Sequence, residues 1–222
     1  MITERANIIR QNRKTIKILI DENGQVSIYA PKHITNSEIE KLVGNKESWA
    51  MKKSFQIKER RENNRDIFDY NSILVCGKEY KVKDYSGKKP GLSNDYFLIP
   101  SKYGKDKYVN VIKKWLKSLS SEMIEKRLSE LSSATNLQYK SVKIGNFKAK
   151  WGSCDSSKNI KINYKVVMLP HKIIDAVLLH ELVHTKVMNH SQAFYKKLIA
   201  IMPEYKKYRA VLKNYGFLLK LY

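Results

Sequence analysis

The sequence predicts an α+β fold with a hairpin-rich N-terminal part, a long central helix, and a C-terminal unit that combines a small sheet with a histidine-bearing helix. Short alternating apolar segments separated by turn residues predict the first part, and apolar residues at spacings of three and four predict the central helix. With 222 residues and 42% hydrophobic content, the chain can bury a core. We expect a strand-rich region over residues 1–100 and a helical region over residues 101–222, either as two domains or as one continuous domain.

Residues 14–31 predict a β-hairpin. Isoleucines alternate with polar residues before the pair Asn23-Gly24, and apolar residues alternate again after it. Asn-Gly supplies the positive φ angles of a type I′ turn. A second hairpin is expected over residues 72–83, around its Gly-Lys pair, and residues 85–95 are rich enough in Gly, Pro, Ser and Asn to be a loop.

A helix is expected between these hairpins, from Thr35 to about Arg61. Thr35, followed three residues later by Glu38, is a capping box, in which each residue's side chain accepts a hydrogen bond from the other's backbone. The expected apolar anchors of this helix are Leu42, Val43 and Trp49.

Residues 105–132 predict a long amphipathic helix that covers one side of the core, because their apolar residues recur at helical spacing. Short strands are expected at about 139–144, 147–151 and 159–164, and the last of these alternates apolar and polar residues. Pro170 then suits the first turn of a helix, and an apolar stripe at helical spacing follows it.

The net charge of +22 is large and favours an anionic partner, such as nucleic acid or a nucleotide. A bias of the composition toward Lys, Asn and Ile explains the charge equally well. Tyrosines and lysines interleave over residues 205–215. Such a mixture either stacks bases and binds phosphates or forms a solvated helix face with buried rings.

Other features bear on the compartment. No apolar run reaches the roughly 18–20 residues of a membrane span, and the N-terminus lacks the apolar core of a signal peptide, so we expect a cytoplasmic protein without a membrane partner. Cys76 and Cys154 lie far apart and outside any CxxC pattern. We therefore expect both thiols to be reduced.

The segment HELVHTKVMNH, residues 180–190, contains three of the chain's five histidines. His180 and His184 are four positions apart on the expected helix, so their imidazoles lie one turn apart on the same face. Zinc favours nitrogen ligands, and catalytic zinc sites use three protein ligands and a water whose pKa falls toward about 7. Glu181 directly follows the first histidine and is placed to take the proton of that water. The pattern predicts one Zn²⁺ per chain and a hydrolytic reaction.

Three residues are candidates for the third ligand. A continued helix would carry His190 about 15 Å from His180 along the axis, at 1.5 Å per residue, so the chain must turn between them. Asn189 offers that turn, because asparagine tolerates left-handed backbone and caps a following helix. We favour His190, with Glu204 and His171 as alternatives.

The segment before the histidines supplies candidate substrate contacts. These candidates are Lys150, Trp151, Ser153 and Asn163. Gly152 lets the backbone approach a ligand closely, while its neighbours bind substrate or polarise an oxygen; alternatively, the tryptophan is a core anchor beside a bend. The strand at 159–164 either borders the cleft, where an extended peptide adds as another strand, or is interior with no free edge.

The stretches KWGSCDSSKNIKINYKVVMLP and HELVHTKVMNHSQAFY, within residues 150–195, resemble the YgjP-like metallopeptidase family, a group of zincins related to SprT-type and WLM-type metalloproteases. The resemblance implies a zincin-like C-terminal unit with Glu181 as the general base. The zinc ligands that it implies are His180, His184 and His190. The ligand spacing is also that of the metzincins, but Val187 stands where they place a glycine.

Three functions follow from these patterns. The first is a zinc-dependent hydrolase, a metallopeptidase that acts on a peptide or protein with Glu181 activating the water. The second keeps the metal but hydrolyses a nucleotide or another phosphate ester. The third is a non-catalytic module that binds nucleic acid or protein and in which zinc is structural.

Overall fold

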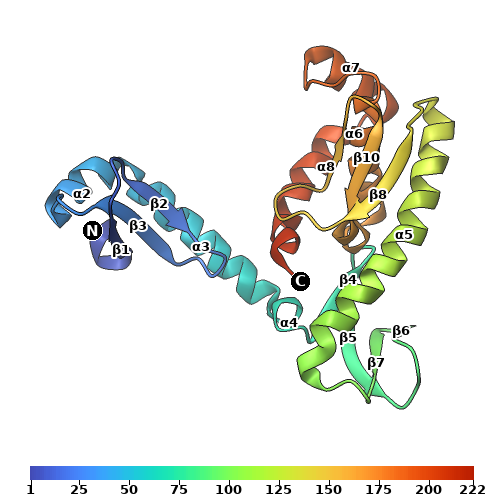
Figure 1. The fold of residues 1–222 in the computed structure, drawn as a ribbon, viewed down its shortest axis with the longest axis horizontal. Helices are drawn as coiled ribbons and strands as arrows, with labels where there is room; N and C mark the ends of the chain where they lie inside the picture. The colour runs from blue at the N-terminus through green and yellow to red at the C-terminus, as the bar shows by residue number, and fades with distance from the viewer. The chain divides into compact units, whose positions relative to one another are not determined.

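A computed structural model describes all residues 1–222 and is drawn in Figure 1. The chain has the mixed α+β composition that the sequence predicts and forms two compact units, Met1–Phe68 and Asp69–Tyr222. No helix combines the length and the apolar character needed to cross a membrane. A compact unit is not by itself a domain that folds alone, so the domain division expected at about residue 100 stays a prediction.

The first unit contains a three-stranded sheet. Its strands are β1 (Asn7–Gln11), β2 (Lys17–Ile20) and β3 (Val26–Pro31), and the short helix α1 (Ile2–Arg5) precedes them. The central strand β3 pairs antiparallel with β2 and parallel with β1. The predicted hairpin is therefore confirmed, and β1 adds a strand that the sequence analysis missed.

The turn of this hairpin differs from the predicted type I′. Only Gly24 has a positive φ, +76°, whereas a type I′ turn needs two such residues. The Asp21 carboxylate accepts hydrogen bonds from the backbone N–H groups of Asn23 (2.9 Å) and Gln25 (2.8 Å). This carboxylate stabilises a longer turn, in which glycine takes the left-handed position.

The predicted helix of this unit is helical over most of its expected range, but it is interrupted rather than continuous. Thr35 caps α2 (Asn36–Val43) as predicted, with its hydroxyl accepting from Glu38 N (3.2 Å). A 3₁₀ turn at Gly44–Lys46 then interrupts the helix before α3 (Glu47–Asn63) and α4 (Arg65–Phe68).

The interruption changes which residues face the core. Of the expected anchors only Val43 is buried, whereas Leu42 is 62% and Trp49 is 56% exposed. The 3₁₀ turn alters the helical register, so that Ala50 and Ser54 form the buried face of α3. The core of the unit consists of Ile2, Ile28, Ala30, Ile39, Val43 and Ala50.

The second unit begins with a four-stranded sheet. Its strands are β4 (Ser72–Val75), β5 (Lys78–Tyr85), β6 (Gly91–Ser93) and β7 (Tyr96–Pro100), in the order β4-β5-β7-β6. The predicted second hairpin is confirmed, but its turn is Cys76-Gly77 rather than Gly77-Lys78, and both turn residues have positive φ. The expected loop at 85–95 contains β6, which pairs with β7.

The Cys76-Gly77 turn fixes the chain segment that leads into the histidine helix. The backbone N–H of Cys76 donates to Val167 O (2.7 Å), and that of Gly77 donates to Met168 O (3.2 Å). A Cβ atom on Gly77 would lie 2.7 Å from Pro170 Cγ, so only glycine fits here without a shift. This sheet therefore positions the start of the helix that follows Pro170.

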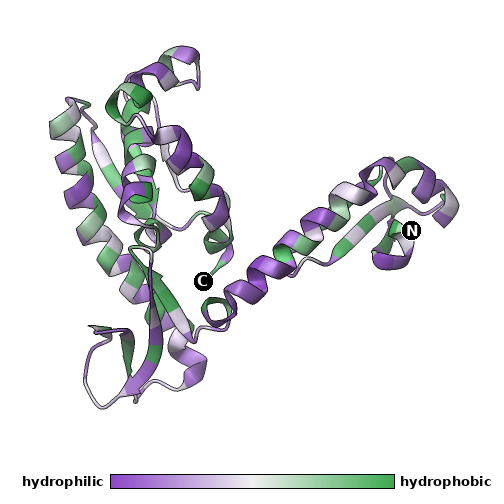
Figure 2. Ribbon diagram, turned by 180° about the vertical axis from the view of Figure 1, so that it is seen from behind, coloured by the Kyte–Doolittle hydropathy of each residue, from purple (hydrophilic) through white to green (hydrophobic).

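The predicted central helix is confirmed as α5 (Tyr108–Thr135), which follows the 3₁₀ turn η2 (Lys105–Lys107). Figure 2 shows apolar and polar residues interspersed along α5, and the buried residues recur every four positions, as in an amphipathic helix. Its buried aliphatic residues are Ile112, Leu116, Ile124 and Leu128. Asn136, with φ of 54°, takes the left-handed conformation that ends the helix.

A second three-stranded sheet precedes the histidine helix. It is formed by β8 (Ser141–Gly145), β9 (Gly152–Cys154) and β10 (Asn159–Asn163), in the order β8-β10-β9. The strand expected at 147–151 is wrong, because the extended residues are those of β9. The central position of β10 excludes a free edge on that strand, so β9 is the edge strand on this side.

The remaining elements are mostly helical. They are η3 (Tyr164–Met168), α6 (His171–His184), α7 (Gln192–Ile201), α8 (Tyr205–Leu212) and η4 (Lys213–Lys220). Pro170 is the N-cap of α6, close to its predicted place, but the N-cap of α7 is Ser191 rather than Asn189. Helix α6, which contains His180 and His184, packs against α5, β9, α7 and α8.

Candidate active site

Helix α6 and the segment after it bring three histidines together. His180 and His184 lie one turn apart, with their Nε2 atoms 3.2 Å from each other. The chain turns after α6 and returns His190, whose Nε2 lies 3.0 Å from that of His180. The candidate ligand atoms of all three residues lie within 4.8 Å of one another.

The geometry of this donor set fits a zinc ion. Zn–N bonds of 2.0–2.1 Å in a tetrahedral shell place the nitrogens about 3.3 Å apart. The two measured Nε2–Nε2 distances, 3.0 and 3.2 Å, are close to this spacing. Three side-chain donors also leave one tetrahedral position for water or substrate, which is typical of catalytic rather than structural zinc sites.

Hydrogen bonds fix the orientation of two of the rings. Nδ1 of His180 lies 2.8 Å from the Tyr205 hydroxyl, and Nδ1 of His184 lies 3.0 Å from Val187 O. A ring that donates from Nδ1 to a carbonyl presents the Nε2 lone pair, so the His184 contact sets the metal-binding tautomer. The Tyr205 hydroxyl is equally placed to accept from His180.

Phe194 forms an apolar floor under the cluster. Its fully buried ring lies 4.9, 4.5 and 5.0 Å, between centroids, from the rings of His180, His184 and His190. Burial, followed by the proximity of the other two histidines, lowers the pKa of His180 to about 3. Burial also lowers the pKa of His184. Both rings are therefore neutral near pH 7, the form that binds metal.

Glu181 is buried beside the histidines and lies directly against the backbone of Gly152. A Cβ atom on Gly152 would lie 2.7 Å from Glu181 Oε1 and 2.9 Å from its Cδ. Burial raises the pKa of Glu181 to about 8, an effect that the positive charge of Lys150 opposes. The expected close approach to the Gly152 backbone is thus made by the chain's own carboxylate.

A cavity of about 240 Å³ opens beside His180 and Glu181. Its other lining residues come from β9 and the residue before it, from α6, and from α8; they are Trp151, Gly152, Ala176, Val177, Tyr205, Arg209 and Leu212. The cavity therefore combines a cation, an aromatic wall and apolar side chains with the histidine and the carboxylate.

The residues predicted to contact substrate differ in their distance from the cavity and in their burial. Trp151 lines the cavity, whereas the half-buried Ser153, two residues further along the chain in β9, is not one of its lining residues. The exposed Lys150 places its Nζ 5.3 Å from the centroid of the Phe147 ring. None of these positions conflicts with a role in substrate binding.

Asn163, in contrast, is fully buried. Its Nδ2 donates to the carbonyls of Phe147 (2.7 Å) and Lys150 (3.2 Å), and its Oδ1 accepts from Lys165 N (3.2 Å). These bonds use its amide to position the loop before β9, and its buried position gives the expected substrate contact no support.

Glu204 and His171 lie outside the cluster. The exposed Glu204 carboxylate accepts hydrogen bonds from Lys207 Nζ (3.1 Å) and from the Tyr208 hydroxyl (2.7 Å). His171 begins α6, nine residues before His180, and is therefore about 13 Å from it along the axis at 1.5 Å per residue. Neither residue joins the donor set that His190 completes.

Two further residues of the site, Tyr205 and Arg209, are not predicted as site residues by the sequence. Tyr205 was noted only within the run of tyrosines and lysines, where the alternatives were base stacking and a buried ring. It is 5% exposed and contacts His180, so the buried alternative holds for this residue. Nothing in the local pattern marks Arg209, since its place depends on how α8 packs against α6.

Three imidazoles with an open coordination side and a buried carboxylate in the adjoining cavity define the class of metallohydrolase sites. Residues 14–215 match the YgjP-like metallopeptidase domain. The chain belongs to this YgjP-like family and carries a metallopeptidase domain, as the resemblance of its two motifs implied.

The comparison with solved structures adds one protein, the metallopeptidase zymogen of Pyrococcus abyssi abylysin. It shares 22% sequence identity over 40% of this chain and 90% of that chain, with a TM-score of 0.37. The similarity is too low to support an argument about this chain. None of the curated proteins matches.

Proposed function

We propose that the chain is a zinc-dependent peptidase in which His180, His184 and His190 bind the metal and Glu181 transfers the proton. The family match supports the peptidase reaction in general. The observation that supports the residue roles most directly is the convergence of three Nε2 atoms at His180, which lines one cavity together with the Glu181 carboxylate. The other side chains of the site then have supporting roles.

Glu181 carries out the proton transfers. When bound, zinc supplies Lewis acidity toward the scissile carbonyl and lowers the pKa of water to about 7. In its ionised form, which a neighbouring cation favours over the raised pKa of the buried group, Glu181 accepts the proton of the attacking water and returns it to the leaving amine, so one carboxylate serves both steps. Gly152 leaves the space in which the carboxylate lies, and Tyr205 orients the ring of His180.

The edge strand β9 is the place where we expect an extended peptide to bind. One side of β9 pairs with β10 and the other side has no strand partner, so its backbone can pair with a substrate strand. Gly152, the first residue of β9, and Trp151 before it line the cavity with Glu181. A peptide paired with β9 would therefore pass the carboxylate, with Ser153 and Lys150 near it.

Arg209 favours a second substrate class as well. A guanidinium in the cavity wall would bind either an acidic side chain of a peptide or a phosphate group. A nucleotide or phosphate-ester hydrolase would use the same histidines and Glu181. Assaying nucleoside triphosphates beside a labelled unfolded protein distinguishes the two substrate classes.

The substitution Glu181→Gln tests the proposed reaction. It preserves the size of the side chain but removes the proton acceptor, so cleavage of a fluorescently labelled unfolded protein should slow by about 10²- to 10⁴-fold. The zinc content should stay at about one per chain, because no ligand is changed. Glu204→Gln, which alters an exposed carboxylate outside the cluster, is the matched control and should cleave at the wild-type rate.

The metal content of histidine variants completes this test. His190→Ala should lose zinc, because two remaining ligands bind it poorly, whereas His171→Ala should retain it. Near wild-type turnover in Glu181→Gln at full zinc content would remove Glu181 from the mechanism. If the wild-type protein bound nucleic acid or protein but cleaved no substrate, the zinc would instead be structural.

A further inference from the structure

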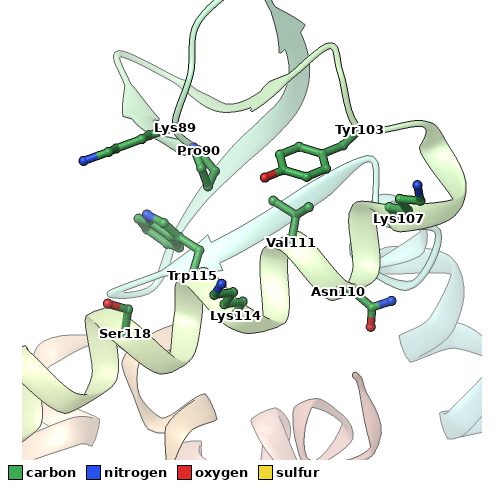
Figure 3. Close-up of a pocket in the computed structure, with 9 residues that line it drawn as sticks. All are labelled: Lys89, Pro90, Tyr103, Lys107, Asn110, Val111, Lys114, Trp115 and Ser118. Carbon is green, nitrogen blue, oxygen red and sulfur yellow. The ribbon is translucent and has the colours of Figure 1, made fainter.

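A larger cavity, of about 750 Å³, lies in the second unit between α5 and the segments that flank β6 and β7. Figure 3 shows its lining residues: Lys89, Pro90, Tyr103, Lys107, Asn110, Val111, Lys114, Trp115 and Ser118. We call it the α5 cavity. It shares no lining residue with the cavity at the histidines, so the proposed peptidase reaction leaves it without a function.

The charge of the α5 cavity is positive only. Three of its lining residues are the exposed lysines Lys89, Lys107 and Lys114, and no aspartate or glutamate lines it. The ammonium groups of these lysines form no ion pair within the chain. Their charge is therefore available to a ligand that carries several negative groups.

Two aromatic side chains give the α5 cavity its walls. The half-buried ring of Trp115 packs against Phe97, with the centroids 4.8 Å apart, so its position is fixed by the core. Tyr103 faces the cavity from the segment before η2, as Figure 3 shows. Aromatic rings among lysines form the stacking platform and phosphate contacts that proteins use for single-stranded nucleic acid.

We propose that the α5 cavity binds single-stranded nucleic acid, with bases stacked on Trp115 and Tyr103 and phosphates bound by the three lysines. A strand fits better than a mononucleotide, because Lys107 and Lys114 are seven residues apart, about 10 Å along the helix at 1.5 Å per residue. A strand can place a separate phosphate at each lysine, which a nucleoside monophosphate, with its single phosphate, cannot do. A duplex fits less well, because its base faces are already stacked on one another.

Fluorescence anisotropy with a labelled thymidine oligonucleotide of about 12 residues tests this proposal. We expect binding at about 50 mM salt, with a log K that falls against log salt by about 0.7 per phosphate contacted. A duplex of the same length, thymidine monophosphate and an acidic peptide should each compete poorly. The full chain in its zinc-loaded form is used throughout.

Two variants assign the binding to the cavity. Lys107→Gln with Lys114→Gln should weaken binding by more than about tenfold and reduce the salt slope by about 1.4, because two phosphate contacts are lost. The matched control is Lys196→Gln with Lys197→Gln, which removes the same charge from the exposed face of α7 and should reduce the slope by less than half as much.

A third variant tests the stacking. Tyr103→Leu keeps an apolar side chain but removes the ring, and it should weaken binding by about 5- to 150-fold without changing the salt slope. Trp115→Phe, which preserves the packing against Phe97, should weaken binding less and remove the tryptophan quenching that a stacked base produces.

Several results would overturn the proposal. They are an equal loss in the α7 control, unchanged affinity in Tyr103→Leu, and duplex, mononucleotide or acidic peptide bound as tightly as the oligonucleotide. The absence of any binding at about 50 mM salt would overturn it too. Protease activity in these variants should remain at the wild-type level, so failure here is distinguishable from failure of the proposed peptidase.

Discussion

The two cavities of the second unit differ in how their polar groups are held. Around the histidines, His180 and His184 each bond a fixed partner, and Glu181 is buried against Gly152. In the α5 cavity, the lysines are exposed and have no ionic partner. Catalysis needs donors held to fractions of an ångström, whereas binding a flexible polyanion needs charge and stacking surface that adapt to it.

This difference predicts two separate sets of mutational effects. Changes near the histidines should alter metal affinity and turnover with little dependence on salt. Changes in the α5 cavity should alter nucleic-acid binding and its salt dependence, and leave turnover unchanged. The following three substitutions test this separation in order of decreasing expected effect.

Gly152→Ala should have the largest effect on turnover. The added Cβ would lie 2.7 Å from Glu181 Oε1, closer than real Cβ contacts allow, so the carboxylate must move. A displacement of about 1 Å of a catalytic group costs on the order of 10² in rate, which we expect in kcat at full zinc content. The assay is cleavage of the labelled unfolded protein.

Gly91→Ala is the matched control for this substitution, because Gly91 also lies in a strand and a Cβ there meets no atom within 4 Å. It should cleave at the wild-type rate. If Gly152→Ala lost zinc, or if it turned over normally, the contact with Glu181 would not be what keeps the carboxylate in place.

Tyr205→Phe should have a smaller effect, on metal affinity. It removes the hydroxyl that contacts His180 Nδ1 and leaves the ring in place, and loss of such an outer contact typically weakens metal binding by about 10- to 100-fold. Competition with a zinc chelator measures this. Tyr208→Phe, which changes a half-buried tyrosine bonded to Glu204 outside the cluster, should retain wild-type affinity; equal losses in both would contradict a specific role for Tyr205.

Local patterns in the sequence predicted the parts of the molecule that depend on near neighbours. The spacing of His180 and His184 on a helix, the capping by Thr35 and the central helix all rest on contacts within a few residues. The predicted anchors Leu42 and Trp49 are exposed because a 3₁₀ turn at Gly44–Lys46 interrupts the helix, and propensity alone did not indicate that turn.

The contacts that the sequence did not predict join residues far apart along the chain. The contact of Glu181 with Gly152 joins residues in α6 and β9, and the contact of Tyr205 with His180 depends on α8 packing against α6. The α5 cavity likewise assembles residues from two loops, a 3₁₀ turn and a helix. Spacing along the chain carries no signal for such contacts, although the excess of lysine did favour an anionic partner.

A lysine in a third environment gives the smallest and most quantitative prediction. Lys165 is 1% exposed, and its Nζ donates to Leu219 O (2.8 Å), which joins η3 to η4. Burial, with a smaller contribution from the positive charge of Lys113, lowers the pKa of Lys165 from 10.5 to about 8. Below pH 8 both the folded and unfolded chains carry the proton, and the cost of the buried charge is fully present. Between about pH 8 and 10.5 the unfolded chain retains a proton that the folded chain releases, so stability rises with pH there.

Lys165→Met removes this titration while preserving a long side chain. The free energy of unfolding of the wild type, measured with urea, should therefore rise relative to that of Lys165→Met by up to about 2 kcal/mol between pH 8 and about 9.5, since each pH unit in this window is worth about 1.4 kcal/mol. Lys114→Met, at an exposed lysine of the α5 cavity, is the control and should follow the wild type at every pH. Parallel curves for the wild type and Lys165→Met would mean that Lys165 is solvated like the lysines of the α5 cavity, and the contrast between buried, partnered groups and free charges would not extend to this residue.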